Sequence, residues 1–193
     1  MITLYFDFAS PYSYFALEPL QVLAKRHHQP LQLKPILLWA VLQEQGMEPP
    51  IKHDYMIHDM QRSARFHGAD YRQPEQFPNS SHLVARAFYA IVESQPELAG
   101  TFAEAAFHAF FALGEDISDK TIIARICKRI SADTTLLAQD NTANAAKQAL
   151  QLSIRAAAGD QCFGVPFIMV ESESFFGADR LPQVELWLRT GGF

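Results

Sequence analysis

Apolar and polar residues alternate in two short stretches near the start of the chain, residues 2–8 and 31–38, and this two-residue period predicts β-strands. Between them, residues 11–27 carry apolar side chains at three-to-four-residue spacing, which predicts a helix. Pro11 at the first helical position, with Ser10 before it, is typical of a helix start. Strand, helix and strand together form a β-α-β unit, which implies a parallel pair of strands.

Helical spacing dominates the middle of the chain. It predicts helices over residues 41–45, 54–66, 80–92, 102–113, 118–130, 131–137 and 141–158, the last ending at Gly159. Strand-like patterns return at residues 163–170 and 174–177, before a final predicted helix over residues 179–189. This order predicts an α/β protein with a thioredoxin-like fold and a large all-helical insertion. We assign residues 1–39 and 140–193 to the thioredoxin-like domain and residues 40–139 to the helical insertion domain.

Composition and charge narrow the function classes. Apolar residues make up 49% of the chain and charged residues 19%, so the chain can bury a sizeable core. The net charge is -5 and no basic run is longer than Lys25-Arg26, which argues against a nucleic-acid partner. No apolar stretch reaches membrane-spanning length, so no membrane partner is expected. The chain enters a strand at once, without a basic region or cleavage site, which predicts a cytoplasmic protein. Cys127 and Cys162 form no Cys-x-x-Cys pair, and no disulfide is expected in that compartment.

Four stretches resemble a known family. They are residues 6–14 (Phe-Asp-Phe-Ala-Ser-Pro-Tyr-Ser-Tyr), 59–62 (Asp-Met-Gln-Arg), 163–166 (Phe-Gly-Val-Pro) and 175–181 (Phe-Phe-Gly-Ala-Asp-Arg-Leu). In these motifs, their order and their spacing, the chain resembles the kappa-class glutathione transferase and 2-hydroxychromene-2-carboxylate isomerase family, the glutathione-using relatives of bacterial disulfide oxidoreductases. The resemblance implies a thioredoxin-like enzyme with glutathione as cofactor, a small-molecule substrate and a homodimeric state.

The turn between the first strand and the first helix carries the main catalytic prediction. Disulfide oxidoreductases have Cys-Pro-x-Cys there, whereas this chain has Ser10-Pro11-Tyr12-Ser13, so it cannot cycle between dithiol and disulfide. A hydroxyl at a helix start can donate a hydrogen bond to the thiolate of a ligand, helped by the partial positive charge and free N–H groups there. Lowering a thiol pKa from roughly 8.5 by about one to two units takes roughly 1.4 to 2.7 kcal/mol. We therefore predict Ser10 as the catalytic residue that holds glutathione thiolate; the alternative is that Ser10 is only an N-cap. Ser13 is a weaker candidate for direct contact.

The resemblance also assigns the rest of the glutathione half of the site. Val165-Pro166 resembles a cis-proline turn whose backbone pairs with a bound peptide, against the alternative of an ordinary trans proline at a strand start. Asp179 is predicted to bind the γ-glutamyl end of glutathione, and its alternative role is the N-cap of the last helix. The predicted cofactor-binding residues are Ser10, Val165, Pro166, Phe176, Gly177, Ala178 and Asp179. The family often has Ser or Asn where this chain has Ala178.

The substrate half matches the family less well. The isomerase pattern has a basic residue and an Asn-Arg pair in the insertion, and no such pair occurs over residues 42–52. Lys52, Arg62 and Asn79 are the predicted substrate-binding residues. Aromatic residues at helical spacing, Phe102, Phe107, Phe110 and Phe111, are either core or the wall of an apolar pocket. The seven histidines form no metal-ligand pattern, so no metal site is predicted.

Three functions are therefore open. The first is a glutathione-dependent isomerase, in which the thiolate adds reversibly to an unsaturated aromatic-derived acid, a bond rotates, and the thiolate leaves. The second is a kappa-like transferase that leaves glutathione on the product. The third is a non-catalytic thioredoxin-like module that binds a peptide or protein partner at Val165-Pro166.

Overall fold

A four-stranded mixed sheet forms the centre of the protein. The computed structural model describes residues 1–48, 53–77, 79–137 and 139–193. The strands are β1 (Ile2–Phe6), β2 (Leu31–Pro35), β3 (Phe167–Val170) and β4 (Glu173–Phe176), in the spatial order β2-β1-β3-β4. β1 runs parallel to β2, and β3 runs antiparallel to both β1 and β4. The first parallel pair is thus the one that the β-α-β pattern predicts.

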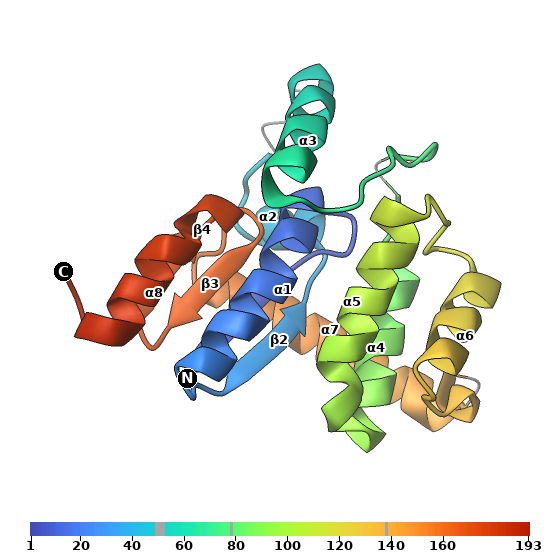
Figure 1. The fold of residues 1–193 in the computed structure, drawn as a ribbon. Helices are drawn as coiled ribbons and strands as arrows, with labels where there is room; N and C mark the ends of the chain where they lie inside the picture. Colours follow the sequence, from blue (N-terminus) through green and yellow to red (C-terminus); the bar gives the residue numbers. More distant parts are fainter. Residues whose placement is uncertain (49–52, 78, 138) are drawn as a thin grey trace.

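Helices cover both faces of this sheet. α1 (Pro11–Arg26) and α8 (Leu181–Thr190) lie on one face, and α7 (Asp140–Gly159) crosses the other (Figure 1). The segment between β2 and α7 is helical: it holds α2 (Leu38–Glu44), α3 (His53–His67), α4 (His82–Ser94), α5 (Ala99–Phe107), α6 (Lys120–Arg129), a π-helical turn (His108–Ala112) and two 3₁₀ turns (Pro96–Leu98 and Thr134–Leu137). A further 3₁₀ turn, Ala178–Arg180, precedes α8. This arrangement confirms the predicted thioredoxin-like fold with a helical insertion.

The insertion helices are joined to the sheet by a shared aromatic core. Phe6 and Phe8 at the end of β1 pack against Phe88 of α4 and Phe107 of α5, with ring centroids 5.1 to 6.4 Å apart. All four side chains are buried. The division at residues 39/40 and 139/140 stays a prediction.

Some predicted element boundaries are wrong for identifiable reasons. Residues 163–166 are not strand, and β3 begins at Phe167, because Pro166 has no N–H to donate to the ladder. The second strand ends at Pro35 rather than at residue 38, since Leu38 already begins α2. Residues 131–137 do not form the predicted helix. They contain only the four-residue 3₁₀ turn Thr134–Leu137, and Asp133 before it accepts the N–H of Thr135.

Candidate active site

Strand directions gather the predicted glutathione-binding residues at one end of the sheet. β1 runs toward Ser10, and its antiparallel pairing with β3, with Tyr5 opposite Phe167, puts residue 166 beside that end. β4 runs antiparallel to β3 and therefore ends there too, just before Gly177. The N–H of Gly177 donates to the carbonyl oxygen of Pro166 at 3.0 Å. Ala178 lies in one buried cluster with Phe15 and Ala16 of α1, so the turn before α8 lies against the first helix.

Ser10 is the N-cap of α1, and its hydroxyl still has a hydrogen to donate. Its Oγ accepts the N–H of Ser13 at 3.2 Å, and its carbonyl oxygen accepts the N–H of Tyr14. Pro11 has no N–H, so the unpaired donors of the first turn, among the described hydrogen bonds, are the N–H of Tyr12 and the hydroxyls of Ser10 and Ser13. The cap role and the predicted thiolate role are therefore compatible, because one uses the oxygen and the other uses its hydrogen.

Ser13 faces the interior. Its side chain is fully buried, and its Oγ has no hydrogen-bond partner in the described part of the chain. A buried hydroxyl without a partner destabilises the fold by about 1 to 3 kcal/mol. The burial argues against direct contact between Ser13 and a ligand, and leaves Ser10 as the accessible hydroxyl of the pair.

The peptide bond between Val165 and Pro166 is cis, which confirms the predicted isomer. The N–H and C=O of Val165 have no partner among the hydrogen bonds of the described residues. The half-exposed rings of Phe163 and Phe176 meet edge to face beside this turn, with centroids 4.9 Å apart. The ring of Phe176 covers Gly164, where an added Cβ would lie 2.5 Å from Cε2 of that ring. An extended peptide would find an unpaired backbone and an aromatic flank here.

The turn after β4 differs from the predicted helix start. Asp179 lies inside the 3₁₀ turn, and neither this turn nor α8 has a side-chain cap, so the N-cap alternative for Asp179 is wrong. The reason is that the 3₁₀ turn places the start of α8 two residues further on, at Leu181. The side chain of Asp179 is 71% exposed, and its carboxylate lies 3.4 Å from the guanidinium of Arg180. Gly177 has φ 106°, a conformation that favours glycine.

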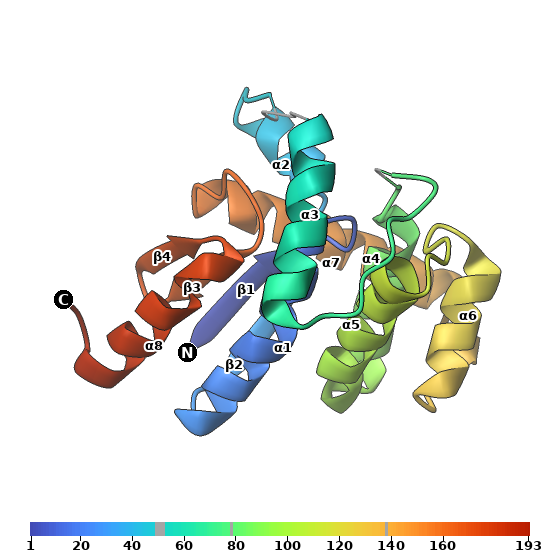
Figure 2. The ribbon, with the colours of Figure 1, turned by 45° about the horizontal axis from the view of Figure 1, so that its top comes forward.

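The helix α3 is joined to the Ser10 turn through a carboxylate. Tyr12 donates its hydroxyl hydrogen to Oδ2 of Asp59 at 2.7 Å, and Arg62 pairs with the other oxygen of Asp59. Burial raises the pKa of Asp59, but the hydrogen bonds from Tyr12 and Arg62 outweigh it and hold that pKa below its usual range. Figures 1 and 2 show α3 standing apart from α4, α5 and α6. The predicted substrate residue Arg62 is thus tethered close to Tyr12 and keeps 55% of its side chain exposed.

The other two predicted substrate residues are placed differently. Asn79 already uses both ends of its amide, since Nδ2 donates to Asp116 at 2.6 Å and Oδ1 accepts the N–H of Ser80. Lys52 lies outside the described residues. Of the three, only Arg62 has a described connection to the Ser10 turn.

The four clustered phenylalanines of the insertion are core. All of them are buried, so they do not line an open pocket: Phe102, Phe107, Phe110 and Phe111. Trp39, in the first turn of α2, is instead 55% exposed. Sequence periodicity gave no signal for it, because a helix start does not reveal which side is covered. Since β2 runs parallel to β1, α2 begins at the same end of the sheet as Ser10, which places the exposed Trp39 near that end.

Asp7 is a second residue that sequence reasoning missed. It sits between two phenylalanines at the end of β1, and its side chain is buried with no basic partner in its hydrogen bonds. Burial raises the pKa of Asp7, while hydrogen bonds from Ser81 and from the N–H groups of Ala9 and Leu38 oppose the shift. The sequence feature that could have identified Asp7 is a single acidic residue among the apolar residues at the end of a predicted strand.

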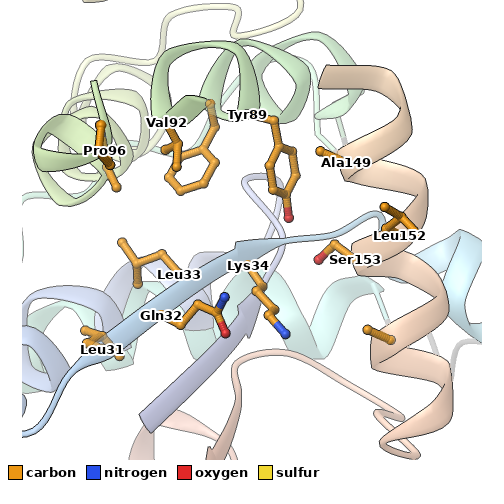
Figure 3. Close-up of a pocket in the computed structure, with 13 residues that line it drawn as sticks. Leu31, Gln32, Leu33, Lys34, Tyr89, Val92, Pro96, Ala149, Leu152 and Ser153 are labelled. Atoms are coloured by element: carbon orange, nitrogen blue, oxygen red, sulfur yellow. The ribbon is translucent and has the colours of Figure 1, made fainter. Parts of the chain in front are cut away.

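A hollow of about 470 Å³ lies elsewhere, along the open edge of β2 between α4 and α7 (Figure 3). Its lining is mainly apolar, and Tyr89 inside it donates its hydroxyl hydrogen to the carbonyl oxygen of Pro35 at 2.9 Å. None of the predicted site residues lines this hollow. It is separate from the Ser10 site.

The two cysteines are inert thiols. Both are free and buried, and burial raises the pKa of Cys127 to about 11 and of Cys162 to about 12. The thiol of Cys162 donates to the carbonyl oxygen of Gly164 at 3.3 Å. Across residues 1–48, 53–77, 79–137 and 139–193, no His, Cys, Asp or Glu side chains gather in a group that could hold a metal ion. In the same ranges no helix has the length and apolarity needed to cross a membrane.

A thioredoxin-like sheet, a cis-proline turn and a helix start with serines in both cysteine positions define a thioredoxin-like protein without active-site thiols. A model of the DSBA-like thioredoxin domain matches residues 1–189, so the chain belongs to the DSBA-like thioredoxin domain family.

Named relatives agree with the resemblance found in the motifs. The chain is 28% identical to glutathione S-transferase kappa 2 of Caenorhabditis elegans, over 95% of this chain and 89% of the relative. It is 27% identical to 2-hydroxychromene-2-carboxylate isomerase of Pseudomonas putida, over 96% of this chain and 92% of the relative. Among solved structures, a 2-hydroxychromene-2-carboxylate isomerase superposes with a TM-score of 0.84 at 25% identity, covering 97% of this chain and 94% of that one. These matches confirm the family that the motifs indicated.

Proposed function

We propose that this protein is a glutathione-dependent isomerase of an unsaturated, aromatic-derived carboxylic acid. The observation that carries the proposal is the hydrogen-bond pattern of Ser10. Its oxygen caps α1, which leaves the hydroxyl hydrogen free at a helix start where two cysteine positions are serines. Such a turn suits a thiolate brought by a ligand.

The residues at this end of the sheet fit glutathione. The unpaired N–H and C=O of Val165 match the backbone of a short peptide, and the exposed carboxylate of Asp179 suits an ammonium group. Bound glutathione would supply a nucleophilic thiolate. Ser10 and the N–H of Tyr12 would hold its sulfur, Val165 would align its backbone, and Asp179 would bind its γ-glutamyl end. Keeping the thiolate ionised and oriented lowers the barrier to its attack.

The acceptor would bind on the side of Ser10 formed by α2 and α3. The guanidinium of Arg62 is exposed there and would pair with the carboxylate of the acid. The exposed indole of Trp39 offers a flat apolar surface for an aromatic ring. This assignment replaces the buried phenylalanines of α5 and of the π-helical turn after it as the aromatic part of the pocket.

Two measurements test the proposal. Calorimetric titration should detect glutathione binding at millimolar concentration or below. Hydroxychromene and benzylidenepyruvate-type acids should then isomerise with catalytic glutathione, without loss of free thiol. Failure to bind glutathione at millimolar concentration would favour the non-catalytic module.

A kappa-like transferase is the second candidate, and the similarity to the C. elegans kappa transferase favours it. The two candidates differ in whether free thiol is consumed. No isomerisation across the acid panel, with glutathione consumed by chlorodinitrobenzene, would replace the isomerase with the transferase.

A further inference from the structure

Asp7 joins three separate segments through one buried carboxylate. Its Oδ1 accepts the N–H of Ala9 at 2.9 Å and the hydroxyl of Ser81 at 2.5 Å, and its Oδ2 accepts the N–H of Leu38 at 2.9 Å. Its backbone carbonyl oxygen also accepts the N–H of Ser10 at 2.9 Å. Every donor is uncharged, so this is a junction of hydrogen bonds rather than an ion pair.

Each donor lies at a different element, and two of these elements belong to the proposed site. Ala9 belongs to the turn that presents Ser10, Leu38 is the first residue of α2, and Ser81 precedes α4. Neither α2 nor α4 has a side-chain cap of its own. The hydroxyl of Ser81, which could cap α4, is directed to Asp7 instead. The starts of both insertion helices are therefore held against the Ser10 turn by this one side chain.

We propose that Asp7 is a positioning residue that fixes α2, which carries Trp39 of the proposed acceptor half, and the start of α4 relative to the hydroxyl of Ser10. The inference rests on the proposed glutathione-dependent reaction. Displacement of reacting groups by about 1 Å can slow a reaction about 100-fold, so a junction at this place controls the chemical step.

The chemistry of the side chain explains why it is a carboxylate. Three donors converge on two oxygens, and an ionised carboxylate is the side chain that only accepts. Asn would turn one of these oxygens into an NH₂ group that faces an N–H. Asp7 itself is buried with its oxygens occupied, so it acts through Ser10, α2 and α4 rather than by touching the substrate.

Two variants of the full chain test this role. Ser81→Ala removes the tie to α4 and leaves the bonds to Ala9 and Leu38. Asp7→Asn removes the carboxylate charge, which weakens the ties, and replaces one of the two acceptor oxygens by an NH₂ group. Ser153→Ala, at a buried serine on α7, is the control for losing a buried hydroxyl. The readouts are the Kd for glutathione, the pKa of its bound thiol, the melting temperature, and kcat with the hydroxychromene acid or, if only that reacts, chlorodinitrobenzene.

In Ser81→Ala, kcat should fall about tenfold or more while the Kd and the thiol pKa of bound glutathione stay unchanged. In Asp7→Asn the thiol pKa should also rise, because the weaker hydrogen bond from the N–H of Ala9 lets the Ser10 turn shift. Ser153→Ala should leave kcat, the Kd for glutathione and the thiol pKa as in the wild type.

The outcomes separate this inference from the proposed function. A wild type that binds no glutathione and turns over neither probe overturns both. An active wild type whose Ser81→Ala variant keeps full kcat, or loses kcat only as far as Ser153→Ala does, overturns the positioning role alone. If Asp7→Asn fails to fold, Ser81→Ala decides the question.

Discussion

Replacing Ser10 by alanine should separate two functions of one hydroxyl. The oxygen caps α1 by accepting the N–H of Ser13 at 3.2 Å, and losing a serine N-cap destabilises a helix by about 0.5 to 2 kcal/mol. For a protein of this size, about 1 kcal/mol corresponds to a melting temperature lower by roughly 2 to 4 °C. Ser10→Ala should therefore be folded and slightly less stable.

The hydroxyl hydrogen should control the bound thiol. A hydrogen bond to a charged partner contributes about 1.5 to 3 kcal/mol, and one pKa unit equals about 1.36 kcal/mol. Without this bond, the pKa of bound glutathione should rise by about one to two units, toward the free value of roughly 8.5. The ultraviolet absorbance of thiolate in the complex, followed against pH, measures this pKa directly.

The matched control is the N-cap of α6. Asp119 there accepts the N–H of Thr121 at 2.7 Å, far along the chain from the Ser10 turn. Asp119→Ala should lower the melting temperature by a similar amount and leave the thiol titration unchanged. If Ser10→Ala also leaves that titration unchanged while its melting temperature drops, Ser10 is only a cap and the proposed mechanism is refuted.

Three further changes give distinct readouts. Asp179→Asn should weaken glutathione binding by about 1 kcal/mol, which is less than a buried charged hydrogen bond contributes because this carboxylate is exposed, and calorimetry should find this loss without a change in melting temperature. The folded-state pKa of Asp59 is lowered, so its contribution to stability is present above its unfolded pKa of about 3.9 and is lost as pH falls through the folded value. Asp59→Asn should therefore reduce the fall in melting temperature at acidic pH, and an unchanged fall would contradict this. Gly164→Ala should displace the ring of Phe176 and weaken glutathione binding, whereas Gly159→Ala, with open space around its Cβ, should not; equal affinities in the two variants would show that the aromatic flank is not needed.

Local features of the sequence predicted most of the fold. The β-α-β start, the strands near the C-terminus and the N-cap at Ser10 follow from spacing and cap chemistry within a few residues, and the structure confirms them. The serines in place of cysteines can be read without any structure. The family motifs indicated the cis bond before Pro166, which local sequence alone leaves open.

Contacts between distant residues were decided only by the tertiary structure. Asp7 meets Ser81 across 74 positions, and Tyr12 meets Asp59 across 47. The spacing of apolar residues does not predict such pairs, because hydrogen-bond partners depend on which side chains are brought together by packing. The sequence by itself determined the order of elements and the chemistry at the Ser10 turn, since both are local. The folded chain decided which aromatic residue stays exposed and which carboxylate joins the two halves of the site, since both depend on how the insertion packs on the sheet.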